Sequence, residues 1–329
     1  MHLLLAPVRW LMHLIGVPLG WVQRTFGMGG MAAVFLAPNL LVFSVFIVFP
    51  IGVNVWYSFT GGAALFPAGR VFVGTEQYDL LLACDSYLDP FSCRQDRFWK
   101  GVHNTAFFVV AQVAAMVAAA LITALVLNRE IRGRGFWRAV FFFPVLLSPV
   151  VVGLMWKWIL LRDGALNALL VSLGYQRIEF LTDPQWAMFW VIFVSVWAHL
   201  GFYALILLAG LQAIPHDVYE AAKMDGTPAM RVFWRITLPL LWPTMLVVLV
   251  LASIRAVQVF DDAYVLTGGG PGTATFFIVQ YIYETGFAGA ARNLGLAAAA
   301  SMLMALVLVV LTLAQLGITA WRDRQEGKR

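Results

Sequence analysis

Residues 219–239 read YEAAKMDGTPAMRVFWRITLP and differ sharply from the segments on either side. They carry charged side chains at Glu220, Lys223, Asp225, Arg231 and Arg235. The flanking runs, VWAHLGFYALILLAGL (196–211) and LLWPTMLVVLVLASI (240–254), are almost wholly apolar. The chain therefore places one compact charged segment between two hydrophobic stretches.

The composition points to a membrane protein. Of the 329 residues, 61% are hydrophobic and only 12% are charged, whereas a soluble protein has about 25% charged residues. A helix that spans a bilayer needs roughly 20 mostly apolar residues. The runs of that length predict six transmembrane helices, at 31–57, 104–128, 138–161, 187–212, 243–266 and 295–319. We expect an all-α, polytopic membrane protein.

The N-terminal segment, residues 1–28, is expected to lie on the membrane. It lacks the charged start and the small-residue cleavage site of a signal peptide. Polar or small residues recur at spacings of three and four, at Arg9, His13, Gly16, Gly20 and Arg24. Pro18 is expected to interrupt this helix. An interfacial helix is favoured over a seventh span, and residues 29–329 are expected to form the transmembrane domain.

Lysine and arginine residues predict the orientation, because they concentrate in cytoplasmic loops. The short loop NREIRGRGFWR (128–138) is the strongest indication. It places both termini and the loop at 215–239 in the cytoplasm of a bacterial cell, and the loop at 58–103 outside. The net charge of +5 then reflects topology and gives no reason to expect a nucleic-acid partner.

Cys84 and Cys93 are the chain's two cysteines. Both lie in the loop at 58–103, which faces an oxidising compartment under this topology. The context predicts a disulfide; two reduced thiols that lie close together are the alternative.

The charged loop, residues 215–239, is predicted to contain two short helices. Pro215 ends the preceding span, and Asp217 is expected to cap the first helix, with Glu220 completing a capping box. Gly226 stands where a helix-terminating residue with positive φ belongs.

A second helix is expected directly afterwards. Thr227 is predicted to cap it, with Pro228 at its first position, and Leu238–Pro239 is predicted to turn the chain back toward the bilayer. Taken alone, this pattern is equally typical of an ordinary amphipathic cytoplasmic loop.

The motif within this loop resembles a known family. Glu-Ala-Ala at 220–222, then Gly226, then Ile-x-Leu-Pro at 236–239 is similar to the EAA motif of the membrane-spanning subunits of bacterial ABC importers. The resemblance implies that this loop docks into an ATP-hydrolysing subunit. The implied coupling residues are Glu220, Ala221, Ala222, Asp225 and Gly226. The implied partners are a second permease subunit, two ATP-binding subunits and an extracytoplasmic solute-binding protein.

Other segments resemble the sugar-permease branch of that family, specifically the maltose-type first permease. They are FVGTEQYDLL (72–81), FWKGVHNTAFF (98–108) and FDDAYVLTGGGPGTAT (260–275). Gln77 departs from the asparagine usual before Tyr78. The resemblance implies import of a carbohydrate, a di- or oligosaccharide. Glycerol phosphate or another polyol is an alternative substrate, and an ion-coupled secondary transporter is an alternative class.

Charged residues within predicted spans are candidates for the substrate path. Arg255 lies mid-span, where a charge costs about 2.5–3.5 kcal/mol. Gln258 and Asp262 are expected to share its helical face, with Asp261 beside them. Either a structural Arg–Asp pair or a polar wall of the path explains this pattern. Weaker candidates on the preceding span are Trp197, His199 and Tyr203, whose rings could stack on a sugar or simply pack.

Several kinds of chemistry are not indicated. No stretch matches the phosphate-binding Gly-x4-Gly-Lys-Ser/Thr pattern, so the chain is not expected to be an enzyme. ATP and Mg are expected on the partner subunits, with no cofactor on this chain. The scattered histidines show no zinc motif, and no metal site is expected. The GGGPG stretch (268–272) is interpreted as a turn between the fifth and sixth spans.

Overall fold

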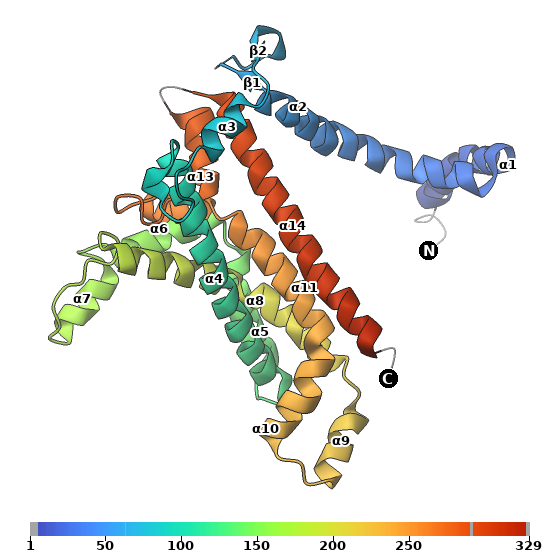
Figure 1. The fold of residues 1–329 in the computed structure, drawn as a ribbon. Helices are drawn as coiled ribbons and strands as arrows, with labels where there is room; N and C mark the ends of the chain where they lie inside the picture. Colours follow the sequence, from blue (N-terminus) through green and yellow to red (C-terminus); the bar gives the residue numbers. More distant parts are fainter. Residues whose placement is uncertain (1–5, 63, 290–291, 327–329) are drawn as a thin grey trace. The chain divides into compact units, whose positions relative to one another are not determined.

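The computed structural model describes residues 6–62, 64–289 and 292–326 and is almost entirely helical (Figure 1). The helices are α1 (Ala6–Phe43), α2 (Phe49–Ser58), α3 (Glu76–Leu82), α4 (Asp96–Asn128), α5 (Arg134–Phe142), α6 (Pro149–Leu160), α7 (Ala165–Ser172), α8 (Pro184–Gln212), α9 (His216–Met224), α10 (Ala229–Val232), α11 (Leu238–Val257), α12 (Asp261–Thr267), α13 (Ile278–Tyr283) and α14 (Leu294–Glu326). Two short antiparallel strands, β1 (Thr60–Gly61) and β2 (Val71–Phe72), pair with each other. The predicted all-α class is confirmed.

Five helices of the described residues are long and apolar enough to span a membrane. They are Gly20–Ser58, Asp96–Asn128, Pro184–Gln212, Ala229–Val257 and Leu294–Gly317. A sixth span exists only if the bent pair 134–146 and 149–172 is counted as one, and its two halves meet at 99°. The prediction of a continuous third span over 138–161 is therefore wrong. Ser148 is extended (ψ 136°), because the ring of the following Pro149 disfavours helical backbone before it.

The chain divides into two compact units, Met1–Tyr57 and Ser58–Arg329. In the first unit, α1 passes through Pro18 without a break. The non-helical residue is Gly27 (φ 65°, ψ −159°), a conformation open to glycine because it has no Cβ. The predicted interruption at Pro18 is therefore corrected to Gly27, which lies within the candidate first span, Gly20–Ser58. Residues 1–5 lie outside the described residues, and the interfacial position of 1–28 stays a prediction.

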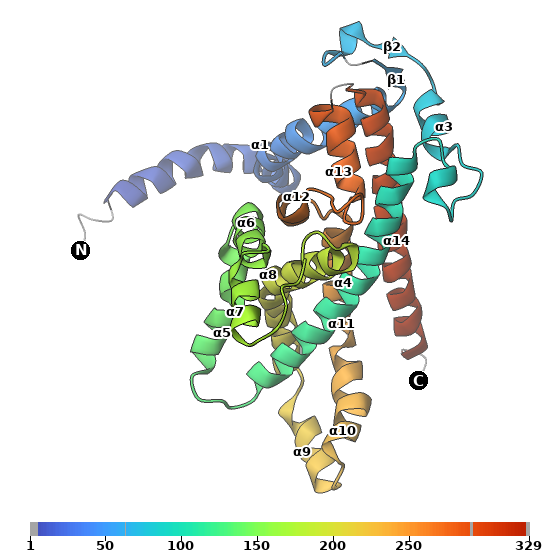
Figure 2. The ribbon, with the colours of Figure 1, turned by 90° about the vertical axis from the view of Figure 1, so that its left-hand side faces the viewer.

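The second unit has α4 and α8 at its centre. Fully buried side chains there include Phe108 and Met116 from α4 and Leu207 from α8. Small residues such as Ala120 let the two helices approach closely, as is usual between membrane helices. Figures 1 and 2 show α9 and α10 at one end of this unit and α3 and α13 at the opposite end.

Gly201 marks a close contact between α8 and the end of α5. A Cβ atom at this position would lie 2.2 Å from the carbonyl oxygen of Phe141 and 2.7 Å from Cα of Phe142. Both neighbours are backbone atoms, which cannot rotate away.

We predict that Gly201→Ala lowers the free energy of unfolding of the purified protein by about 1–3 kcal/mol, the usual cost of overpacking, and therefore lowers its melting temperature. The measurement is a melting curve in detergent. Gly135→Ala in α5 is the matched control, since a Cβ there meets nothing within 4 Å. Equal melting temperatures for both variants would contradict the predicted contact.

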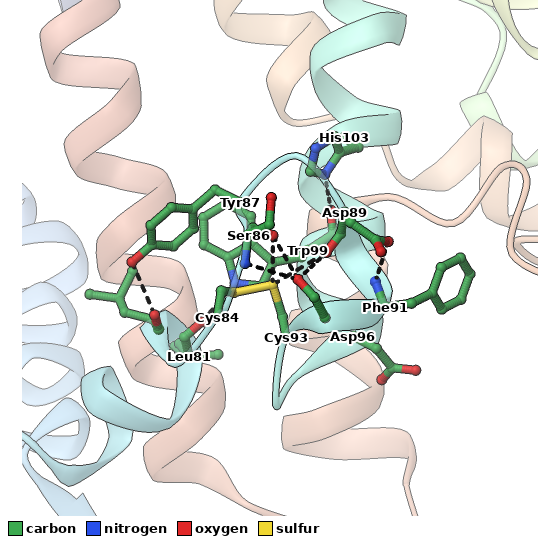
Figure 3. Close-up of a disulfide and its surroundings, with 12 residues drawn as sticks. Leu81, Cys84, Ser86, Tyr87, Asp89, Phe91, Cys93, Asp96, Trp99 and His103 are labelled. Atoms are coloured by element: carbon green, nitrogen blue, oxygen red, sulfur yellow. Dashed lines mark hydrogen bonds between the residues drawn. A yellow bond between two sulfur atoms is a disulfide. The ribbon is translucent and has the colours of Figure 1, made fainter.

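The segment after α3 is held by a disulfide between Cys84 and Cys93 (Figure 3). The indole Nε1 of Trp99 donates to the carbonyl of Leu81 at 2.8 Å, and the rings of Tyr87 and Trp99 lie 5.0 Å apart. The disulfide therefore closes a short loop that packs on the first turn of α4.

Below it, Tyr281 of α13 donates its hydroxyl to Oε1 of Gln95 at 3.1 Å. Burial raises the pKa of Tyr281 to about 12, so this phenol remains a hydrogen-bond donor at neutral pH. The contact joins α13 to the residues just before α4.

We predict that the unreduced, denatured protein contains no thiol available to a maleimide reagent. Cleavage by trypsin at Arg94 should be slow in the wild type and faster in the Cys84→Ser/Cys93→Ser double variant. The reason is that a disulfide closing a loop of this length stabilises the folded loop by ~3 kcal/mol, because it lowers the entropy of the unfolded chain. Cleavage at Arg129 is the internal control. Labelling of both cysteines without reductant would contradict the bridge.

Candidate functional site

The first helix of the charged loop, α9, begins at His216, two residues earlier than predicted. Pro215, with φ −58° and ψ 134°, occupies the cap position, so Asp217 lies inside the first turn and does not cap the helix. The predicted capping box is wrong for the same reason. Oε1 of Glu220 instead lies 3.2 Å from Nδ1 of His216, one turn earlier.

The end of α9 matches its prediction. Gly226 has a φ of 65°, its N–H donates to the carbonyl of Lys223, and the N–H of Thr227 donates to the carbonyl of Ala222, both at 3.0 Å. These two bonds form a Schellman motif, which satisfies the last carbonyls of the helix. The sharp reversal after α9 depends on this conformation.

The second helix differs from its prediction in two ways. Pro228, not Thr227, occupies the cap position, and α10 begins at Ala229. The helix then continues through Leu238–Pro239 up to Val257, so the predicted turn there is wrong. A π-helical turn over Phe233–Thr237 explains the continuity. Pro239 cannot donate a backbone hydrogen bond, and a wider turn next to it absorbs that loss.

A surface hollow of about 490 Å³ lies between α9, the turn that follows it and the π-helical turn after α10; we call it the α9–α10 hollow. Its walls are Asp217, Val218, Ala221, Ala222, Asp225, Thr227 and Ile236. The hydroxyls of Tyr219 and Thr237, 3.2 Å apart, join α9 to the helix opposite. Met224 in α9 and Met230 in α10 are 88% and 69% exposed. Exposed methionines on these two helices suit a protein partner, since the thioether chain adapts to a range of surfaces.

The five proposed coupling residues lie together in this region. Ala222 is buried, whereas Glu220, Ala221, Asp225 and Gly226 are exposed. Exposed backbone and short side chains on one side of α9 would let a partner approach closely.

A second cavity, of about 220 Å³, forms where α11 gives way to α12. It is lined by Pro149, Ser195, Arg255, Gln258, Val259, Phe260, Asp261 and Asp262. The prediction that Arg255, Gln258 and Asp262 share one helical face is wrong, because α11 ends at Val257 and Phe260 is non-helical (φ −152°, ψ −67°). The three residues nevertheless border the same cavity. We refer to it as the inner cavity.

The charges of the inner cavity are not joined in a direct ion pair. Among the described residues, no nitrogen of Arg255 lies within 4.0 Å of a carboxylate oxygen of Asp261 or Asp262. Asp262 is 8% exposed, whereas Arg255, Gln258 and Asp261 are exposed. This geometry favours a polar cavity wall over a structural pair.

The weaker candidates on α8 do not lie together. Nδ1 of His199 is 2.8 Å from the carbonyl oxygen of Ser195, which borders the inner cavity. Trp197 packs edge-on against Trp156 at 5.5 Å, and Tyr203 is 2% exposed within the core. We conclude that Trp197 and Tyr203 are packing residues and that His199 is close to the cavity.

Four residues of the inner cavity were not predicted from the sequence: Pro149, Ser195, Val259 and Phe260. Pro149 and Ser195 come from other helices, and no local pattern links them to the residues around 258. Phe260 looked like one more apolar residue of the fifth span.

The family of the chain follows from comparison with known proteins. Residues 113–321 match the model of the binding-protein-dependent transport system inner membrane component, and the chain belongs to this family. The trehalose/maltose transport system permease protein MalF of Thermococcus litoralis is 34% identical over 288 residues, 87% of this chain and 92% of that protein. The lactose transport system permease protein LacF of Rhizobium radiobacter is 33% identical over 297 residues, 88% and 94%.

The fold is similar to a solved transporter. A chain of a bacterial ABC transporter involved in the import of the acidic polysaccharide alginate superposes with a TM-score of 0.75 at 24% identity, over 91% of this chain and 96% of that chain. The family match and the two relatives confirm the predicted resemblance to the permease subunits of ABC importers.

We predict that Gln258→Leu slows substrate uptake roughly tenfold, because losing one well-placed hydrogen bond costs about 1–2 kcal/mol. Basal ATP hydrolysis by the reconstituted complex should stay normal, since the variant leaves the α9–α10 hollow intact. Gln185→Leu at the exposed start of α8 is the control and should transport like the wild type. Unchanged uptake by Gln258→Leu would show that this side chain does not contact the substrate.

Proposed function

We propose that the chain lines the translocation path of an ATP-driven importer for a di- or oligosaccharide. Relatives named for trehalose/maltose, lactose and sulfoquinovosyl glycerol transport support a carbohydrate substrate. The inner cavity supports it as well. An amide, a guanidinium and carboxylates suit a ligand with many hydroxyl groups, each of which can donate and accept.

Glycerol phosphate is the second candidate, because the sn-glycerol-3-phosphate permease protein UgpA of Agrobacterium fabrum is 31% identical over 84% of this chain. Arg255 alone would suit a phosphate. Asp261 and Asp262 border the same cavity and would repel a phosphate dianion. The carboxylates therefore favour an uncharged sugar. Family membership also argues against an ion-coupled transporter.

The hollow between α9 and α10 is the observation on which the coupling role rests. In our proposal, this end faces the cytoplasm and receives one of two ATP-binding subunits, which carry out the hydrolysis. A second permease subunit completes the path. We further propose that both termini are cytoplasmic and that a solute-binding protein docks on the extracytoplasmic side, near the disulfide loop. The solved alginate transporter was captured with a periplasmic protein, which supports a partner of this kind.

We predict that Gly226→Val abolishes substrate-stimulated ATP hydrolysis while the protein still inserts. A β-branched residue at φ 65° is strained by about 1–2 kcal/mol, and relief of that strain would distort the Schellman motif. Gly226→Asn is the matched control, since asparagine tolerates positive φ, and it should retain most of the stimulation. Glu220→Lys should also uncouple the complex.

The measurement is ATPase activity of the complete reconstituted transporter, with and without the loaded binding protein. Normal stimulation in both Gly226→Val and Glu220→Lys would show that the loop is an ordinary connector.

A further inference from the structure

Four aromatic rings form a continuous series at the α12–α13 end of the second unit. Phe260 and Tyr264 are stacked, with centroids 5.1 Å apart and planes at 18°. Tyr283 lies 5.2 Å from Phe260 and 5.9 Å from Tyr264. Phe287 stacks on Tyr283 at 6.4 Å and 28°. We call Phe260, Tyr264, Tyr283 and Phe287 the aromatic track.

The track is unlike the core aromatic contacts of this protein. Phe108 and Phe277 also pair, but both are fully buried, at 0% and 1% exposure. In the track, Tyr283 is 38% and Phe287 57% exposed. Packing alone therefore does not account for four rings drawn from two separate stretches of chain.

One end of the track opens on the inner cavity, since Phe260 is part of that cavity's wall. Tyr264, the next ring, lines a separate cavity of about 400 Å³, together with Arg97, Glu284, Thr285, Ala288 and Gly289. We call it the outer cavity. Tyr264 thus belongs both to the track and to the outer cavity. Tyr283 contacts both Phe260 and Tyr264 and thus packs beside the two rings that border the cavities.

The polar side of the outer cavity is held rigidly. Nη2 of Arg97 lies 2.5 Å from Oε2 of Glu284, and the guanidinium carbon is 4.6 Å from the ring centroid of Phe276. Nε2 of Gln280 donates to Oε1 of Glu284 at 2.8 Å and to the carbonyl of Gly268 at 3.0 Å. Gln280 is only 2% exposed. These contacts fix the Glu284 carboxylate in one orientation in the wall of the outer cavity, which it shares with Tyr264.

We propose that the outer cavity is a second carbohydrate subsite and that the aromatic track leads the sugar from it to the inner cavity. The proposal rests on the carbohydrate function proposed above. A pyranose ring has one apolar C–H face that packs on an aromatic ring, and hydroxyls at its edge. Tyr264 supplies a ring in the cavity wall, and Tyr283, packed edge-on against Tyr264, extends the aromatic surface from it to Phe260. The Arg97–Glu284 pair supplies charge-assisted donors and acceptors for neighbouring hydroxyls.

The chemistry selects an uncharged ligand. Arg97 and Glu284 neutralise one another, so the outer cavity offers no net charge to a phosphate or a carboxylate. A volume of about 400 Å³ lies within the usual range of about 300–1,000 Å³ for small-molecule sites. An acyl chain would gain nothing from the fixed carboxylate, so lipid is not the expected occupant.

The test uses the complete transporter, reconstituted in proteoliposomes with saturating ATP and its binding protein. Uptake of radiolabelled maltose, trehalose and lactose is measured first for the wild type. Tyr283→Leu is then compared with Tyr283→Phe, which keeps the ring, and with Tyr175→Leu, an exposed tyrosine (66%) outside the track.

We expect Tyr283→Leu to raise the KM for the transported sugar about fivefold to tenfold, the loss of about 1–1.4 kcal/mol of aromatic stacking. Maximal uptake, basal ATP hydrolysis and melting temperature should be preserved. Tyr283→Phe and Tyr175→Leu should match the wild type.

Two results would overturn the proposal while leaving the carbohydrate function intact. One is an unchanged KM in Tyr283→Leu. The other is a lower melting temperature or lower maximal uptake at unchanged KM, which would assign the track to packing or to a contact with the partner permease. If the wild-type transporter takes up none of the three sugars but does take up glycerol phosphate, the proposed function itself fails and the subsite fails with it.

Discussion

Backbone polar groups that lie in a bilayer must find partners inside the protein, since hydrocarbon offers none. Continuous helices meet this requirement by themselves, and most of the second unit consists of them. Within the described residues, two helix breaks lie beside the inner cavity: one before Pro149, between α5 and α6, and one at residues 258–260, between α11 and α12. Irregular backbone at membrane depth is tolerated where it lines a water-filled space. The cavity can therefore hydrate the backbone groups that the two breaks leave unpaired, and the breaks in turn form part of the cavity wall.

Close packing keeps the two breaks together. A Cβ on Gly153 of α6 would lie 3.0 Å from the carbonyl oxygen of Asp262 in α12, so the two short helices touch through their backbones. Neither is long enough to span a membrane alone. The first, α6, replaces the second part of the predicted span 138–161, and α12 replaces the end of the predicted span 243–266. The polar side chains of residues 255–262 thereby reach a common space from two different elements.

The sequence predicts the parts of this arrangement that local chemistry determines. Hydropathy located the long spans. The glycine at position 226 predicted a positive φ there, because only a few residue types accept that conformation. Proline explains most of the errors. Pro215 and Pro228 take the cap positions that Asp217 and Thr227 were expected to fill, and Pro149 breaks a span whose hydropathy is uniform. The break at 258–260 has no such signal: Gln258, Val259 and Phe260 are compatible with a helix, and only packing against α6 and α8 ends it there. Arg255, Gln258, Asp261 and Asp262 were thus correctly predicted to lie together. They do so around a cavity between two helices and not on one face of a single helix.

One continuous element connects the two sites. The helix from Ala229 to Val257 starts beside the α9–α10 hollow and ends at the inner cavity, next to Arg255. At 1.5 Å per residue its 29 residues extend roughly 43 Å. A stiff helix of this length carries a displacement from one end to the other, except where its hydrogen bonding is irregular. The π-helical turn at Phe233–Thr237, near the hollow, is such a place, and Pro243, which cannot donate a backbone hydrogen bond, is another at the middle of the helix. Motion of α9 and α10 would therefore bend or turn this helix between its start and Pro243, while the section that reaches the inner cavity moves as one body. This section carries Arg255 and is followed directly by Gln258. A movement of α9 and α10 would therefore shift these two residues of the inner cavity through the helix itself, with no need for a series of side-chain contacts between the two sites.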